Sequence, residues 1–245
     1  MQALAKKTNG CIVVASYNTH GAVGLDGRCE PQRIAKVIAE LGADIVALQE
    51  LRSRNAALES LEFLPRDSGY QAISGPTLTF ADGEFGNGLL TRFPVLAVEH
   101  IRLDVGRREP RAAIDATLDV SGLDAGVTAL RVIATHLGLG PRERNTQIAR
   151  LLEVTRARTD VPTILLGDLN EWFLRSRSLR KLHDHFGESP ARATFPSWLP
   201  LLALDRIWCA PAAALRDVRV HRSRRARTAS DHLPLLAEVE LAKSA

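Results

Sequence analysis

A short stretch of this sequence, TILLGDLNEW at residues 163–172, places a carboxylate and a carboxamide directly after the apolar residues of a predicted buried strand. In an extended segment, side chains two residues apart project to the same side. We therefore expect Asp168 and Asn170 to point together into one site. Either residue could instead be an ordinary turn former, or the cap of a helix that begins near Glu171.

Other polar side chains share this position at the end or the start of an apolar run. They are Asn18, Glu50, His136, Asp205 and the pair Asp231–His232. Taken singly, each has an ordinary explanation as a turn residue or a satisfied core histidine. Charged groups at the ends of buried strands are costly unless they are paired or bound to a metal. Taken together, these residues predict one shared cleft at an edge of the fold.

The elements that must position these residues are mostly strands. Apolar, β-branched or alternating runs predict strands over 11–18, 44–50, 111–120, 126–137, 161–168, 204–210 and 233–241, and two more within 87–103. Helical spacing of apolar residues predicts helices from Pro31 to a stop at Gly42 and from Pro141 to about residue 158. This order favours an α/β sandwich, with two sheets packed face to face and helices outside.

The composition is that of an ordinary globular chain. It has 245 residues, of which 45% are hydrophobic and 24% are charged, with a formal charge of +4 and a pI near 9.2. We expect a single domain over residues 1–245. Cys11, Cys29 and Cys209 are scattered without a CxxC pair, which favours free thiols and argues against a zinc site.

The sequence gives no sign of a membrane segment or a leader. No apolar run approaches the ~20 residues of a membrane span. The N-terminal MQALAKKTNG lacks the apolar core of a signal peptide. We therefore expect a cytoplasmic protein without a transmembrane segment, and the sequence gives no evidence of an obligate protein partner.

Several motifs resemble one family in order and approximate spacing. They are SYNTH, ADIVALQE, NGLLTRFP, ATHL, LLGDLN, LDRIW and SDHLPL, and they span about residues 11–241. The chain is identified by these motifs as resembling the endonuclease/exonuclease/phosphatase superfamily, which includes DNase I-like and exonuclease III-like nucleases, inositol phosphatases and sphingomyelinases. Residues 18–50 especially resemble small bacterial members of unassigned substrate. The resemblance implies a four-layered α/β sandwich that hydrolyses phosphoesters with the help of a metal.

The resemblance also implies a cation site. Asn18 and Glu50 match the family's Mg²⁺ positions, and Asp231 matches an acidic position that reaches the ion directly or through water. Oxygen ligands and retained waters suit Mg²⁺, with Mn²⁺ as a possible substitute. The sequence does not distinguish one metal from two.

Further catalytic roles follow from the same resemblance. Asp168 would orient or deprotonate the attacking water, and Asn170 would donate to a phosphate oxygen. His232 would hydrogen-bond the scissile phosphate or act as the base, and Asp205 would pair with it and fix its tautomer. Which of Asp168 and His232 takes the proton stays open.

Two more residues are expected beside the phosphate. His136 matches a histidine that contributes phosphate contact or acid catalysis in the DNase-like and sphingomyelinase-like branches. Arg111 stands where many members place a basic or polar group.

The substrate class stays open among three alternatives. The first is a nuclease, favoured by the pI and by arginine clusters at 107–111 and 222–227, although the second cluster could be a solvated loop. The second is a phosphodiesterase of lipids or small molecules. The apolar stretch FPSWLPLLALD, at 195–205, could touch a membrane or pack on the core. The third is a catalytically silent binding protein on the same fold.

Overall fold

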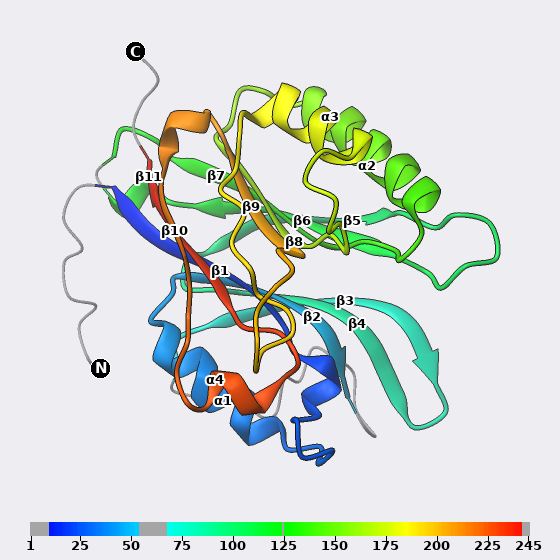
Figure 1. The fold of residues 1–245 in the computed structure, drawn as a ribbon. Coiled ribbons are helices and arrows are strands. Elements are labelled where there is room, and N and C mark those ends of the chain that lie inside the picture. The colour runs from blue at the N-terminus through cyan, green and yellow to red at the C-terminus, as the bar shows by residue number, and fades with distance from the viewer. Residues whose placement is uncertain (1–9, 54–67, 124, 242–245) are drawn as a thin grey trace.

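The computed structural model describes residues 10–53, 68–123 and 125–241 and contains two mixed β-sheets (Figure 1). The six-stranded sheet has the order β10-β11-β1-β2-β4-β3. Its strands are β1 (Cys11–Asn18), β2 (Ile45–Arg52), β3 (Gln71–Phe80), β4 (Gly83–Thr91), β10 (Leu215–Val220) and β11 (Leu235–Glu240). Only β1 and β2 run parallel among the paired strands of this sheet that the structure describes.

The second sheet has five strands in the order β5-β6-β7-β8-β9. They are β5 (Val95–Arg102), β6 (Ala112–Asp119), β7 (Ala129–His136), β8 (Thr163–Asp168) and β9 (Asp205–Ala210). The pair β7–β8 is parallel, and the other three pairs are antiparallel. Each sheet therefore contains one parallel pair, whose two strands end at the same edge.

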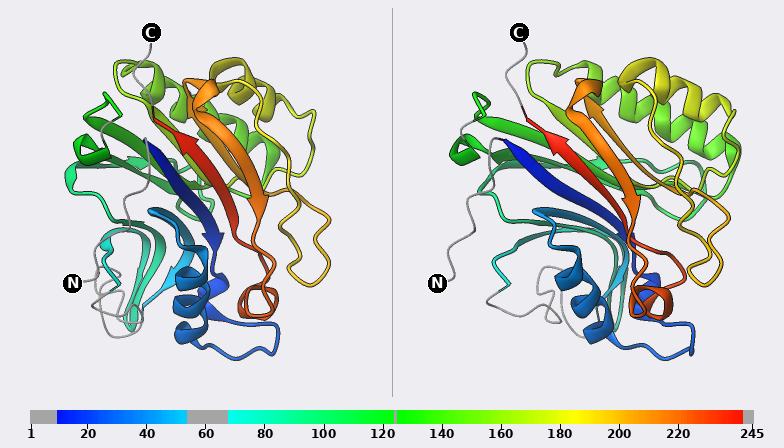
Figure 2. Two further views of the ribbon diagram at one scale, coloured as in Figure 1. Left: turned by 90° about the vertical axis from the view of Figure 1, so that its left-hand side faces the viewer. Right: turned by 60° about the vertical axis from the view of Figure 1, so that its left-hand side comes forward.

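Helices cover the outer faces of both sheets. Within the described residues, the α-helices are α1 (Pro31–Leu41), α2 (Pro141–Arg156), α3 (Arg177–Phe186) and the short α4 (Ala226–Ala229). The same residues form the 3₁₀ turns η1 (His20–Ala22), η3 (Ser121–Leu123) and η4 (Ala212–Ala214). In Figures 1 and 2, α1 and α4 lie against the six-stranded sheet and α2 and α3 against the other. The layer order is helix, sheet, sheet, helix.

The burial pattern agrees with these four layers. The largest apolar cluster lies between the sheets and includes Val14, Ile114 and Ile164. A second cluster fills the space between α1 and its sheet, and a third packs α2 and α3 against β8 and β9. The predicted α/β sandwich is therefore confirmed.

Most predicted elements are present within a few residues of their expected bounds, but β3, β10, α3 and the short α4 were not predicted. Strands β3 and β10 are largely exposed, and β3 contains Pro76, so neither carries a strong apolar pattern. Helix α3 does carry apolar residues at helical spacing, Leu179, Leu182 and Phe186, and could have been predicted. The alternative of a helix beginning near Glu171 is wrong. The next helix begins at Arg177, where Ser176 caps it by accepting a hydrogen bond from Leu179 N at 3.2 Å.

Across residues 10–53, 68–123 and 125–241, no helix combines the length and the apolar character needed to cross a lipid bilayer.

Candidate active site

The ends of four strands bring the predicted polar residues to one edge of the sandwich. Parallel pairing places Asn18 of β1 beside Gln49 of β2, and His136 of β7 beside Asp168 of β8. Asp205 begins the antiparallel strand β9 opposite Asp168. Sheet register thus assembles residues that lie far apart in the sequence.

Asn18 joins the two sheets at this edge. Its Nδ2 atom donates to Glu50 Oε1 and to Asp168 Oδ2, both at 3.0 Å, while its Oδ1 atom accepts from His20 N at 3.0 Å. The amide nitrogen of Asn18 thus faces the two carboxylates, and its amide oxygen accepts a hydrogen bond from the backbone. Cation binding by Asn18 therefore stays a prediction, and the observed contacts give this residue a positioning role.

Unusual backbone conformations aim two of the side chains. Glu50 has φ 54° and lies where the register of β2 against β4 shifts between Leu48 and Leu51, which is a bulge that redirects a side chain. Asn170 has φ 52°, also in the left-handed region. Non-glycine residues rarely adopt this region, and they do so mostly where surrounding contacts hold them.

The GDLN stretch differs from the expected extended geometry. Strand β8 ends at Asp168, and the chain turns so that Asn170 N donates to Asp168 Oδ1 at 2.8 Å. The expectation that both side chains project together from an extended strand was wrong, although they do reach the same site. Gly167 has φ 151°, and a Cβ atom there would meet the carbonyl oxygen of Thr135 at 1.9 Å, so the close approach of β8 to β7 requires glycine.

His232 and Asp205 form a buried pair. His232 Nδ1 lies 2.9 Å from Asp205 Oδ2, which directs Nε2 toward Asp168 Oδ2 at 3.7 Å. Burial opposes charge on the imidazole, but the charges of Asp205 and Asp168 outweigh it and raise the pKa of His232 to about 10. Burial also raises the pKa of Asp205, which the charge of His232 counteracts. The geometry presents Nε2 of His232 to whatever occupies the site.

His136 is held from both sides of its ring. Arg111 Nη1 lies 3.0 Å from Nδ1, and Asn170 Nδ2 lies 3.1 Å from Nε2. Because a guanidinium can only donate, Nδ1 must accept, and Nε2 then carries the proton of the neutral ring. Asn170 Nδ2 is also a donor, so its contact with Nε2 is a packing contact and not a hydrogen bond in this tautomer. Burial is the main cause that lowers the pKa of His136 to about 4. The neutral ring thus directs an N–H toward Asp168 Oδ2, at 3.7 Å, and Glu50 Oε1, at 3.9 Å.

Two carboxylates converge on a position that attracts positive charge. His20 Nδ1 lies 3.6 Å from Glu50 Oε2 and 3.5 Å from Asp231 Oδ2. The contact with Glu50 raises the pKa of His20, against the effect of burial, and the charge of Asp231 adds to it. Burial alone would raise the pKa of Glu50, but its contacts with His20, His136 and Asn18 lower it to about 2. Two oxygen donors beside space for water suit a hard divalent cation, which commonly binds through one or two carboxylates.

The described side chains group too few donors to hold a metal ion by themselves. Within the described part of the chain, no three His, Cys, Asp or Glu side chains are grouped so that they could hold a metal ion. The donor set that fits a cation is therefore Glu50 and Asp231, with the remaining ligands from water or substrate.

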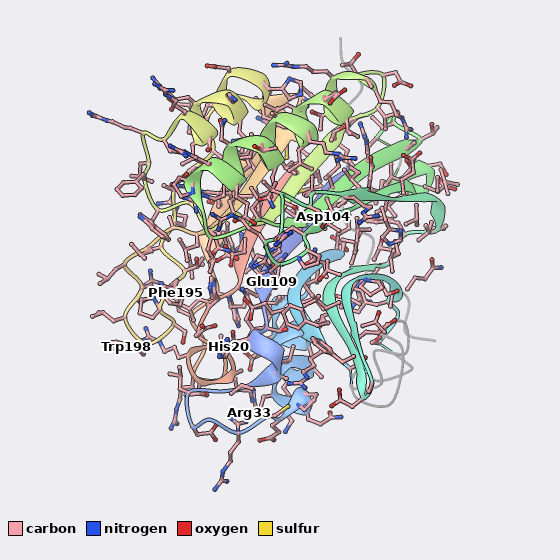
Figure 3. All side chains as sticks on the ribbon, turned by 90° about the vertical axis from the view of Figure 1, so that its right-hand side faces the viewer. His20, Arg33, Asp104, Glu109, Phe195 and Trp198 are labelled. Carbon is pink, nitrogen blue, oxygen red and sulfur yellow. The ribbon has the colours of Figure 1, made fainter. Side chains whose placement is uncertain are left out.

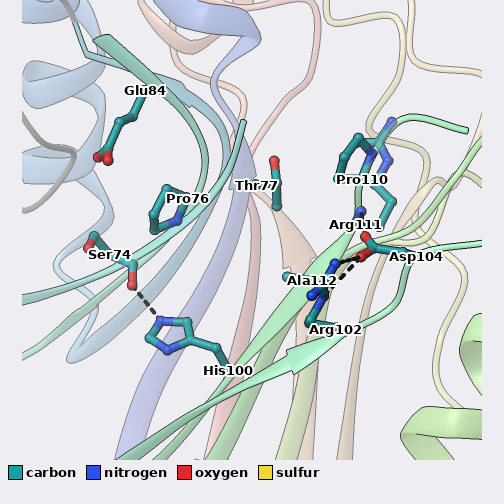
Figure 4. A pocket seen from close by; sticks show the side chains of 10 residues that line it. All are labelled: Ser74, Pro76, Thr77, Glu84, His100, Arg102, Asp104, Pro110, Arg111 and Ala112. Carbon is teal, nitrogen blue, oxygen red and sulfur yellow. Dashed lines mark hydrogen bonds and ion pairs between the residues drawn. The ribbon is translucent and has the colours of Figure 1, made fainter. Parts of the chain in front are cut away.

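Pockets open on both sides of this centre. One, of about 560 Å³, is lined by His20, Glu50 and Glu109 together with the apolar side chains of β3 and β4. The other, of about 570 Å³, is lined by Arg111, Arg102 and His100 (Figure 4). They adjoin where Arg111 Nη2 contacts Glu109 Oε2 at 3.3 Å. Figure 3 looks onto this edge and labels His20, Glu109 and Asp104.

The two arginine clusters differ in their relation to the site. Arg111, from the first cluster, is buried and reaches His136. In the second cluster, Arg225 Nη1 pairs with Glu40 Oε1 of α1 at 2.5 Å, which directs this side chain toward α1. Within the described residues, only the first cluster has a side chain that contacts the predicted site residues.

A buried ion pair, not predicted from the sequence, supports the loops of the site on the side of α2. Arg144 of α2 is 1% exposed, and its Nε lies 3.3 Å from Oε2 of Glu171, which is 2% exposed. Arg144 Nη1 also donates to Leu139 O at 2.6 Å, and Glu171 Oε1 accepts from Phe173 N at 3.1 Å. The pair thus ties the loop after His136 to the loop after Asp168.

A second polar side chain of α2 extends this support. Gln147 Oε1 accepts from Gly138 N at 2.9 Å, and its Nε2 donates to Leu103 O at 3.0 Å, just before the segment that carries Arg111. A Cβ atom at Gly138 would meet the Glu143 carboxyl group at 2.0 Å, so this loop approaches α2 as closely as glycine allows. The sequence shows charged and polar residues along this helix, but it does not show which of them are buried. Arg144 and Gln147 therefore could not be singled out from the sequence.

We expect Arg144→Met to destabilise the fold by about 3–5 kcal/mol, because it leaves the Glu171 carboxylate buried without its partner. The double variant Arg144→Met/Glu171→Leu should regain much of this loss, since it removes both charges. Urea unfolding measures both values. Arg150→Met, on the exposed face of the same helix, is the control and should change little. Equal stability of Arg144→Met and the wild type would contradict the structural role of the pair.

The sandwich and its edge site define a DNase I-like fold. The model of the endonuclease/exonuclease/phosphatase family matches residues 15–232, and the chain belongs to this family. A relative in Escherichia coli K12, the uncharacterized protein YbhP, is 29% identical over 93% of this chain and 96% of its own length.

Solved structures of other members share the fold. A family protein of Bacteroides vulgatus superposes with a TM-score of 0.76 at 18% identity, covering 94% of this chain and 99% of its own. Another, from Beutenbergia cavernae, has a TM-score of 0.74 at 22% identity and covers 96% of this chain and 72% of its own.

Proposed function

We propose that the protein is a divalent-metal-dependent phosphodiesterase that uses water as the nucleophile. The family acts generally on phosphoester bonds, and the observation that carries the proposal for this chain is the convergence at Asp168. Its Oδ2 atom lies 3.0 Å from Asn18 Nδ2 and 3.7 Å from the Nε2 atoms of both His136 and His232. A carboxylate surrounded by donors, beside two more carboxylates, is suited to activate water next to a phosphate.

A bound Mg²⁺, or Mn²⁺ in its place, would supply charge neutralisation of the phosphate oxygens. Glu50 and Asp231 would hold it, because their Oε2 and Oδ2 atoms face a common position now taken by the His20 ring. Whether one or two ions bind is left to metal titration.

The chain's own residues divide the remaining work. Asp168 orients the attacking water and accepts its proton as the new P–O bond forms. His232 Nε2 donates a proton to the ester oxygen as the old P–O bond breaks, and Asp205 holds the ring in that orientation through Nδ1. His136 and Asn170 donate hydrogen bonds to the phosphate oxygens, and Arg111 fixes the tautomer of His136.

Nucleic acid is the first candidate substrate. The basic pI and the cluster at 107–111 support it, since Arg111 reaches the site and exposed Arg107 and Arg108 lie beside it. A lipid phosphodiester is the second candidate, and the exposure of Trp198 and its neighbours favours it. A catalytically silent binding protein would not require this set of ionisable side chains around one carboxylate.

The testing experiment is a hydrolysis panel with Mg²⁺ or Mn²⁺ and with EDTA. The substrates are bis-p-nitrophenyl phosphate, plasmid DNA, single-stranded RNA, sphingomyelin, cardiolipin and inositol phosphates. We expect turnover of at least one diester with metal and none with EDTA. Hydrolysis of lipid with intact DNA would select the second candidate, and no hydrolysis of any substrate would favour the silent binding protein.

A further inference from the structure

Three loops beside the candidate site expose most of the large apolar side chains of the described surface. Of the twelve such side chains, eight come from residues 137–140, 169–176 and 195–204. Scattered exposed apolar residues are ordinary, but a concentration at one edge marks a surface for interaction. The alternative that residues 195–205 pack on the core is therefore wrong for the tip of this loop.

The three loops leave the same edge of the five-stranded sheet. Leu137 N donates to Asp168 O at 3.0 Å, and Leu169 N donates to Leu204 O at 2.9 Å. These bonds join the base of each loop to the next, directly beside His136, Asp168 and Asp205. The apolar side chains consequently surround the site rather than a distant face.

The loop at 195–202 is built to present its tip. Thr194 N and Leu202 N form backbone hydrogen bonds across its base, and Ser197, which is fully buried, donates its Oγ to Ser230 O at 2.7 Å. Beyond this base, Trp198 is 61% exposed and Leu201 is 70% exposed. Figure 3 shows Trp198 farther out than Phe195. The hydrogen bonds at the base fix the loop, so the apolar side chains at its tip stay exposed to solvent.

The loop after Asn170 repeats this arrangement. Trp172, Phe173 and Leu174 are all exposed, and the Arg144 guanidinium lies over the Trp172 ring at 5.4 Å. Leu139, whose carbonyl oxygen accepts from the same arginine, is 63% exposed. One buried arginine thus supports two of the three apolar loops.

Exposed basic side chains lie in and beside these three loops. The basic residues are Arg142, Arg175, Arg177, Arg180, Lys181 and Arg192. The acidic residues Glu143, Glu171 and Asp205 are buried, and Glu188, before the third loop, is exposed. Arg227, from the basic run at 222–227, accepts through its carbonyl oxygen from Ser197 Oγ at 3.1 Å, so this run adjoins the base of the tip. Apolar tips beside exposed basic residues are complementary to an anionic lipid surface.

We propose that these loops insert into the surface of an anionic phospholipid bilayer and present the site to lipid phosphodiesters, the second of the two candidate substrates. The insertion stands by itself, and only the presentation of a substrate rests on the proposed function. Five of the eight exposed side chains are leucines, which suit acyl chains and lack the flat rings on which bases stack. This composition favours a bilayer over single-stranded nucleic acid as the occupant.

Vesicle binding in EDTA tests the insertion without turnover. The full-length protein is sedimented with vesicles of phosphatidylcholine, or of phosphatidylcholine mixed with phosphatidylglycerol, and tryptophan emission is recorded. We expect binding to the anionic vesicles to exceed binding to the neutral ones at least about tenfold, with a blue shift in emission. Trp172 and Trp198 report the insertion, because Trp208 is 1% exposed and already buried.

Paired variants assign the binding to the loops. Trp198→Ser/Leu201→Ser should lower the affinity for anionic vesicles at least about tenfold, whereas Leu96→Ser/Val98→Ser, at two exposed apolar positions of β5, should leave it unchanged. Circular dichroism verifies that each variant is folded. Absence of vesicle binding, or equal loss in both variants, would overturn the proposal. So would loss of oligonucleotide binding by the tip variant without any vesicle binding. Vesicle binding is measured in EDTA without turnover, so its result does not depend on whether the protein hydrolyses any substrate of the hydrolysis panel.

Discussion

Asp168→Asn lowers kcat by about 10³-fold and leaves the protein folded, because the substitution keeps the shape of the side chain and removes its charge. The carboxylate is 1% exposed and is the point at which contacts from both sheets meet. An amide at this position cannot accept a proton from water. The loss is expected in kcat at saturating Mg²⁺, with bis-p-nitrophenyl phosphate as the substrate.

The control for this variant is Asp217→Asn on β10. Asp217 is exposed and contacts Arg219, away from the site. The kcat of Asp217→Asn should therefore equal that of the wild type. Thermal unfolding by circular dichroism establishes that both proteins are folded. Undiminished turnover by Asp168→Asn would exclude this carboxylate as the acceptor of the water's proton.

His232→Ala is the second substitution with a large expected effect, a loss of at least about 10²-fold in kcat. The ring is 4% exposed, with Nδ1 on Asp205 and the ring of Phe195 at a centroid distance of 4.9 Å. Its removal takes away the proton donor for the departing ester oxygen. The loss in kcat should therefore be smaller for a substrate with a good leaving group, such as p-nitrophenolate, than for an alkyl diester.

A double-variant cycle separates the histidine from its partner. Asp205→Asn should cost about tenfold through misorientation of the ring, and the combined variant should be no slower than His232→Ala alone. His100→Ala, at an exposed histidine that contacts Ser74 O in the neighbouring pocket, is the control and should keep full kcat. Additive losses in the combined variant would show that Asp205 does not act through His232.

Most of the strands and the identity of the family were accessible from the sequence because apolar periodicity and motif spacing are local properties. The runs before Asn18, His136 and Asp168 each form the predicted strand. Strand β3 was not predicted because its largely exposed residues show no apolar periodicity. Residue types at strand ends likewise selected the candidate site residues, since buried strands rarely end in charged groups without a reason.

The sequence by itself determined the sandwich, most of its strands and the set of polar residues that the strands deliver to one edge. Only the tertiary structure decided how those residues are used: the amide oxygen of Asn18 turns to His20 N, a bulge aims Glu50, and Arg144 reaches the site loops from the outer helix. Tertiary structure also decided that Trp198 faces solvent. The physical reason is range, because periodicity is set by neighbours along the chain, whereas orientation, burial and hydrogen-bond partners depend on residues that only folding brings together.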